Sequence, residues 1–288
     1  MNRTVALTSM LLIVSAMLFG CGSQPADNAA PQPSQQQTQP AGGADASDEM
    51  KSVTDSYRAY ALEQIDQFVQ ATESFTDAVK NGELEKAQAL YAPTRMFYER
   101  IEPIAEALGD LDPDIDAREN DVPDEEWRGF HRIEKGLWID KTTKGYEAYA
   151  DQLLKDVKLL RGKVETVEVT PQLLVTGAVD LLNEVSSSKV TGEEERYSHT
   201  DLYDFAANVQ GAEKIYEFLK PAIEKKDSSL AQEIEKRFAE IDKLLASCKE
   251  GEGYVLYTEL SEEQIKKMSQ AIDNLAEPLS NIGIVLEG

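Results

Sequence analysis

Residues 53–80 read VTDSYRAYALEQIDQFVQATESFTDAVK, and their apolar positions recur at steps of three and four. These positions are Val53, Tyr57, Ala61, Ile65, Phe68, Ala71, Phe75 and Val79. Such spacing places the apolar side chains on one face of an α-helix, so the segment is predicted to be an amphipathic helix. Asn81 and Gly82 follow and are expected to end it.

The same periodicity continues along the rest of the chain. Pro93 and Pro103 are expected to bend the next helix, an acidic loop of residues 109–123 follows, and Asp124 is expected to cap the helix after it. The helices expected after the first cover about 83–108, 124–138, 144–164, 171–185, 200–224, 228–248 and 261–275. We therefore predict an all-α protein built of antiparallel helical bundles.

The N-terminus has the pattern of a secretory signal peptide. Arg3 precedes an apolar run from Val5 to Phe19, which is too short to span a bilayer as a stable anchor. Residues 18–21, Leu-Phe-Gly-Cys, resemble a lipobox, so residues 1–20 are predicted to be removed and Cys21 to be lipidated. The alternative is a secretory signal with an incidental cysteine near its cleavage site.

Residues 21–47 are rich in Ser, Gln, Pro, Ala and Gly, and are predicted to form a flexible, disordered tether. The helical domain is then expected to span residues 48–288. Acyl chains on Cys21 would hold the protein at the cell membrane, facing the extracytoplasmic side. The other cysteine, Cys248, falls in the apolar stripe of a predicted helix and is interpreted as a buried thiol.

The chain is strongly acidic, with 53 Asp and Glu against 29 Lys and Arg and a formal net charge of −24 at pH 7. Such a charge repels nucleic acid, so that class of partner is excluded. It favours cationic ligands over anionic ones. The alternative is that the acidity only solvates the helix faces.

The chain has two histidines, and the first lies in an unusual segment. His131 and Glu134 are three residues apart, so on a helix they face the same way and can converge on one cation. Bulky apolar residues surround them, which indicates a buried helix where ionisable groups need a partner. The alternative is an ordinary hydrogen bond on a helix surface.

A second acidic patch lies upstream, where Glu99 and Glu102 share a helix face and Asp112, Asp114 and Asp116 follow in the acidic loop. Two like charges on one face repel each other unless a cation lies between them. A solvated acidic face is the alternative.

A third polar patch covers residues 193–201. His199 is expected to cap a helix or to pair with Asp201 rather than to bind a metal directly. Tyr197 and Tyr203 are candidate phenolate ligands for a ferric ion, or they pack at the end of a bundle with their hydroxyls in water.

Taken together, the patches resemble the imelysin-like family, and within it the EfeO-type lipoproteins of bacterial iron uptake. The resemblance covers about residue 53 to the C-terminus. It rests on the segments Tyr98-Glu99-Arg100-Ile101-Glu102-Pro103, Asp112 with Ile115-Asp116, Gly129-Phe130-His131-Arg132-Ile133-Glu134, and Gly192-Glu193-Glu194-Glu195-Arg196-Tyr197-Ser198-His199-Thr200-Asp201.

The resemblance implies a fold of two helical bundles and a metal site. The histidine and glutamate three apart are the family's metal motif, and the implied ligands here are His131, Glu134, Glu99, Glu102, Asp116 and Glu194. Glu193 and Glu195 are the alternatives for the last position. The full-length form of the family adds an N-terminal cupredoxin-like domain, which this chain is expected to lack because its tether leads directly to the helices.

The resemblance also implies a function. A lipid-anchored protein of this kind is expected to capture iron, ferric or ferrous, and to pass it to a membrane iron permease, with a peroxidase as a further partner. Carboxylates with one histidine suit iron, manganese or calcium better than copper(I), and zinc also remains a candidate.

Two other functions stay open. The family has been classed with metallopeptidases, but the chain lacks the zinc-protease pattern of two histidines four residues apart, so no enzymatic activity is expected. A relative in the family suggests a receptor for acidic, alginate-like polysaccharide. Such a receptor would use a bridging cation or a groove lined by Arg95, Arg100, Arg128 and Arg132.

Overall fold

A computed structural model describes residues 42–105, 109 and 111–287 of the chain. The expected signal peptide, the expected lipidation site Cys21 and most of the expected tether lie outside these residues. The first helix, α1 (Gly42–Lys80), begins within the last residues that were assigned to the tether. None of the helices in the described ranges combines the length and apolar character that crossing a membrane requires.

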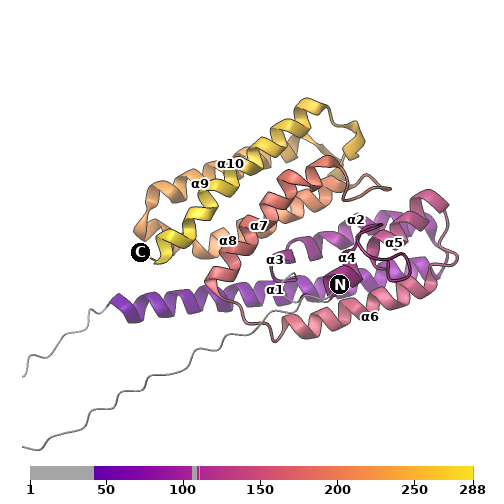
Figure 1. The fold of residues 1–288 in the computed structure, drawn as a ribbon, viewed down its shortest axis with the longest axis horizontal. Coiled ribbons are helices and arrows are strands. Elements are labelled where there is room, and N and C mark those ends of the chain that lie inside the picture. Colours follow the sequence, from indigo (N-terminus) through magenta and orange to yellow (C-terminus); the bar gives the residue numbers. More distant parts are fainter. Residues whose placement is uncertain (1–41, 106–108, 110, 288) are drawn as a thin grey trace, which may run out of the picture. The chain divides into compact units, whose positions relative to one another are not determined.

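The first bundle consists of α1, α2 (Leu84–Glu99) and α6 (Glu147–Val164), which lie side by side (Figure 1). The stripe expected on residues 53–80 is buried in this bundle, because Tyr57, Ile65, Phe68 and Phe75 are all inaccessible to solvent. Short elements connect α2 to α6 along the chain: α3 (Glu102–Ala105), α4 (Asp112–Asp116), α5 (Phe130–Lys135) and a π-helical turn, η2 (Gly136–Asp140).

The second bundle consists of α7 (Pro171–Ser187), α8 (Asp201–Lys226), α9 (Ser228–Ser247) and α10 (Glu262–Glu287) (Figure 1). Cys248 is buried at the end of α9, as its place in the apolar stripe indicated. The remaining short elements are the 3₁₀ turns η3 (Lys189–Thr191) and η4 (Tyr257–Glu259), and the antiparallel hairpin of β1 (Lys249–Glu250) and β2 (Gly253–Tyr254). The prediction of an all-α protein with two antiparallel bundles is confirmed.

Several boundaries differ from those predicted. The prediction that Asp124 caps this helix is wrong, because α5 begins at Phe130, directly after Gly129. The Asp124 carboxylate instead accepts a hydrogen bond from Arg132. The acidic loop contains the short helix α4, and α10 continues through Pro278 to Glu287 instead of ending near Leu275. Pro278 is buried, so side-chain packing offsets the backbone hydrogen bond that proline cannot donate.

The two bundles meet where α2 and α8 cross. A Cβ atom on Gly211 of α8 would lie only 2.5 Å from the carbonyl oxygen of Arg100, just beyond the end of α2. Only glycine permits this separation, because any side chain would collide with backbone. The close contact brings Arg95 and Glu99, near the end of α2, against Asp204 and Asn208 of α8.

Candidate metal centre

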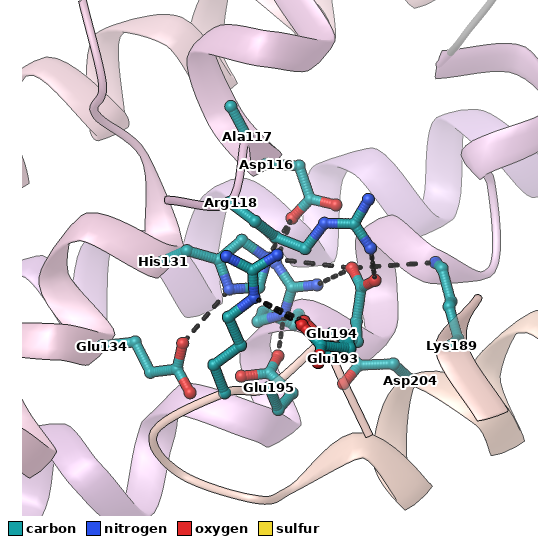
Figure 2. A network of polar contacts seen from close by, with 12 residues as sticks. Asp116, Ala117, Arg118, His131, Glu134, Lys189, Glu193, Glu194, Glu195 and Asp204 are labelled. Atoms are coloured by element: carbon teal, nitrogen blue, oxygen red, sulfur yellow. Dashed lines mark hydrogen bonds and ion pairs between the residues drawn. The ribbon is translucent and has the colours of Figure 1, made fainter. Parts of the chain in front are cut away.

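The candidate centre lies at the junction of the bundles, and its side chains come from elements far apart in the sequence (Figure 2). Asp116 ends α4, His131 and Glu134 lie on α5, and Glu194 and Glu195 come from the connection between α7 and α8. All of these side chains are buried or nearly so. In Figure 2, Asp116 and Glu134 lie on opposite sides of His131.

Glu134 holds one side of the imidazole. Its Oε2 lies 3.2 Å from Nδ1 of His131, while its Oε1 accepts hydrogen bonds from the backbone N–H groups of Tyr197 (3.0 Å) and Ser198 (2.7 Å). Burial raises the pKa of Glu134, but the hydrogen bonds from His131 and Ser198 lower it by more. The net pKa lies below 4.5, so the carboxylate is ionised. An ionised carboxylate can only accept, and it therefore fixes the proton of His131 on Nδ1.

The other ring nitrogen faces two carboxylates. Nε2 of His131 lies 3.5 Å from Oδ1 of Asp116 and 3.8 Å from Oε1 of Glu194. His131 is only 1% exposed, and within the described part of the chain Nε2 makes no hydrogen bond. Asp116, His131 and Glu194 thus offer one nitrogen and two carboxylate oxygens within 4.8 Å of one another, a separation that suits a shared metal ion.

A second group of potential ligands lies on the Nδ1 side of the same imidazole. It consists of His131, Glu134 and Glu195. Burial raises the pKa of Glu195 and Arg95 lowers it. The effect of burial is larger and the pKa is about 8, so at neutral pH this side chain is mostly protonated. By contrast, Lys189 and His131 outweigh burial at Glu194 and hold its pKa well below 4.5. Because a metal ligand must be deprotonated, the group with Asp116 and Glu194 is the better site.

An acidic cavity of about 180 Å³ leads to this group. Asp116 and Glu194 belong to its lining, so the two candidate ligands are reached from the cavity. Its other charged lining residues are Glu102, Asp112, Asp121 and Glu184, with Arg118 as the basic residue among them. The lining thus contains six acidic side chains and one basic one, and Glu102, Asp116 and Glu194 among them pair with Lys189, Arg95 and Arg118.

Two further expected ligands, Glu99 and Glu102, pair with basic side chains of the protein. Glu99 accepts from Lys189 Nζ at 2.9 Å and from Arg95 Nη2 at 2.7 Å, and Glu102 accepts from Lys189 at 3.1 Å. Asn208 of α8 donates to both carboxylates at 2.9 Å. In the metal-free protein, the ammonium of Lys189 therefore lies against both carboxylates, and their role as metal ligands stays a prediction.

Among the arginines that a polysaccharide groove would use, Arg95 is buried and cannot line such a groove. Its side chain is 0% exposed and contacts acidic side chains from four parts of the chain. These partners are Glu99, Asp116, Glu194, Glu195 and Asp204. The spacing of four between Arg95 and Glu99 was the one signal in the sequence for its role, because it predicts an ion pair along a helix.

The structure also separates the three consecutive glutamates. Glu193 is 63% exposed and pairs with Arg196, whereas Glu194 and Glu195 are buried. Tyr197 donates its hydroxyl to Glu119, and Tyr203 packs edge-on against Tyr254, so neither phenol belongs to the candidate ligand group. His199 takes a left-handed backbone conformation, and its carbonyl accepts from the N–H of Tyr257.

Comparison with known proteins identifies the family of the chain. A family model described as Imelysin matches residues 53–282. The chain belongs to the imelysin family. It is 46% identical over 289 residues to an "Efem/EfeO family lipoprotein" of Staphylococcus haemolyticus (strain JCSC1435), with 98% of this chain and 99% of that protein covered. It is 47% identical over 245 residues to one of Staphylococcus aureus (strain NCTC 8325 / PS 47), with 83% and 86% covered.

The resemblance seen in the motifs is therefore confirmed as membership of the imelysin family, and the relatives are named lipoproteins. The family model also carries a peptidase label. In the described residues of this imelysin-family protein, the candidate ligand group contains a single histidine, and His199 takes no part in it.

One glycine positions the histidine of this imelysin-family site. Gly129 precedes α5 with a φ of +88°, and a Cβ atom there would collide with the backbone carbonyl of Ile115 on α4. We expect Gly129→Ala to destabilise the fold by more than about 1 kcal/mol, because alanine tolerates neither the backbone angle nor the contact. Chemical denaturation measures the change.

Gly162→Ala is the matched control. Gly162 lies inside α6, and a Cβ atom there would meet nothing within 4 Å. This substitution should leave stability unchanged or raise it by up to about 1 kcal/mol, because alanine is the better helix former. Equal effects of the two substitutions would contradict the positioning role of Gly129.

Proposed function

We propose that this protein is a lipid-anchored carrier that binds a metal cation between Asp116, His131 and Glu194. Iron is the proposed cargo, and a membrane iron permease is the proposed recipient. The observation that carries the proposal is the buried Nε2 of His131, which lacks a hydrogen bond among the described residues and faces two carboxylates at an acidic cavity. The relatives' name, "Efem/EfeO family lipoprotein", supports it.

The chemistry of the donors supports the choice of cation. Carboxylate oxygens with one imidazole nitrogen suit iron, manganese or zinc, and carboxylates alone also serve calcium. Three protein ligands leave coordination positions open toward the cavity, where water or a chelating group can remain on the ion. Because water or a chelating group can stay on the ion, the protein does not have to enclose it fully. Partial enclosure suits a carrier that captures the ion and later transfers it.

The lipid anchor completes the proposal. Acylation of Cys21 would hold the carrier at the extracytoplasmic face of the cell membrane, with the residues between Cys21 and α1 as the tether of the helical domain. A peroxidase is a further proposed partner. We propose binding rather than catalysis, since a zinc protease would require a second histidine beside the first.

Glu194 and Glu193 provide the test of the site. The two are adjacent in the sequence, but one is buried at the cavity and the other is exposed. We expect Glu194→Gln to weaken binding of Fe²⁺ or Mn²⁺ at least about tenfold, about 1.4 kcal/mol, and Glu193→Gln to change it less than about twofold. Isothermal titration calorimetry on the mature protein measures both. Equal affinities in the two variants would refute the proposed site.

Binding should also depend on pH. Burial and Arg95 lower the pKa of His131, but Asp116, Glu134 and Glu194 outweigh them and hold it well above 6.5. The metal-free protein therefore carries a proton that the cation must displace from His131, and affinity should rise about tenfold per pH unit until that pKa is reached. Calorimetry in buffers of different ionisation enthalpy should detect one proton released per ion. An affinity independent of pH would contradict this.

A further inference from the structure

The candidate site already contains positive charges supplied by the protein. Arg95 approaches the ligands from the interior: its Nη1 pairs with Oδ1 of Asp116, the same oxygen that faces Nε2 of His131. Its Nη2 lies 3.5 Å from Oε1 of Glu194, which also faces Nε2. Each carboxylate of the candidate ligand group therefore contacts Arg95 in the metal-free protein.

Arg95 is fixed in this place. Its side chain is 0% exposed, and it is held from behind by Glu99 at 2.7 Å, by Glu195 at 2.6 Å and by Asp204 at 3.3 Å. Phe130 packs near the guanidinium, 5.8 Å from its ring centroid. Arg95 cannot move into solvent when a cation enters, so its charge stays next to the cation.

Arg118 contacts the same site from the cavity. Its Nη1 lies 2.9 Å from Oε2 of Glu194, and its side chain is 24% exposed. Arg118 can turn toward solvent because its other partner, Asp121, is itself partly exposed. The two arginines thus contact Glu194 through different oxygens, one from the interior and one from the entrance.

We propose that Arg95, with Arg118 at the entrance, is a built-in competitor of the cargo cation that keeps the site from binding it too tightly to release. The inference rests on the proposed function and adds how that site is regulated. The competition has two parts. The arginines hold Asp116 and Glu194 in place when no metal is bound, and their charges repel a bound ion in an interior that screens poorly. A carrier needs this balance, since affinity is set mainly by the dissociation rate.

The test compares two substitutions at one position in the full mature protein. Arg95→Gln removes the charge, whereas Arg95→Lys loses the planar fork but keeps the charge. We expect Arg95→Gln to bind Mn²⁺ at least about tenfold more tightly than wild type, with slower release to excess EDTA in stopped flow. Arg95→Lys should stay within about threefold of wild type. Arg161→Gln, in a surface pair with Asp66, controls for net charge.

If Arg95 only stabilises the structure of the site, Arg95→Gln should bind Mn²⁺ more weakly, not more tightly. If Arg95→Gln binds Mn²⁺ with equal or lower affinity than Arg95→Lys, the inference is overturned. Folding of Arg95→Gln only in the presence of Mn²⁺, followed by circular dichroism, supports it, because the ion then replaces the missing charge.

If Arg95→Gln folds under neither condition, Arg118→Gln decides: severalfold tighter binding supports the inference, and unchanged or weaker binding overturns it. Failure of the wild type to bind any cation would instead refute the proposed function. A wild type that binds through His131 but is not tightened by these substitutions refutes only the competitor.

Discussion

Replacing His131 by alanine should weaken cation binding at least about a hundredfold, about 2.8 kcal/mol. The substitution removes the single nitrogen ligand of the group and leaves Asp116 and Glu194 to hold the ion without it. The cavity that reaches these carboxylates would remain open, because His131 is not part of its lining. Calorimetry with Fe²⁺ under anaerobic conditions, repeated with Mn²⁺, measures the loss.

Glu134→Gln tests whether Glu134 orients His131, the proposed metal ligand, without binding the metal itself. The glutamine side chain keeps the size but loses the charge that fixes the proton on Nδ1 of His131. Once the ring has lost one proton to the cation, the remaining proton is no longer held on Nδ1, and a proton on Nε2 excludes the cation. We expect a loss of about 10- to 100-fold, the range typical of residues that orient a metal ligand. An unchanged affinity would show that Glu134 does not orient the ring.

His199→Ala is the matched control for His131→Ala. It removes the other histidine of the chain, which lies outside the candidate ligand group. Its affinity should stay within about twofold of wild type, because no proposed ligand is lost. If His199→Ala weakens binding as much as His131→Ala, the cation binds elsewhere.

The helices were predictable because their signal is local. The stripe of residues 53–80 is repeated every three or four positions, and the buried face of α1 follows it directly. Boundaries at prolines were less predictable. Pro93, Pro221 and Pro278 all lie inside helices, the first two exposed to solvent and the third buried, so a proline alone did not end these helices.

The candidate site was predictable only in part, for the same reason. His131 and Glu134 share one short helix, so their spacing alone places them together. The partner of Glu99 and Glu102 is Lys189, which lies on η3 after the whole of α6 and α7, and no local pattern connects them. The burial of Arg95 could not be predicted either, since arginine is usually exposed and its five acidic partners are scattered along the chain.

Glu99→Ala should destabilise the metal-free fold by about 3–5 kcal/mol. The Glu99 carboxylate is fully buried and accepts from Arg95, Lys189 and Asn208. Burial lowers the pKa of Lys189, but Glu102 and Glu99 raise it well above 10.5, so its ammonium stays charged. Alanine would leave buried cations with fewer counter-charges, and the melting midpoint should fall by about 6–20 °C.

Glu63→Ala provides the control, because Glu63 is an exposed glutamate on α1 that accepts from Gln67 at 3.2 Å. Its removal should change stability by no more than about 0.5 kcal/mol. The two possible roles of Glu99 predict different measurements. A counter-ion of Arg95 and Lys189 affects the unfolding of the metal-free protein, whereas a metal ligand would lower the affinity and leave that unfolding unchanged. A tenfold loss of affinity with unaltered metal-free stability would return Glu99 to the ligand group.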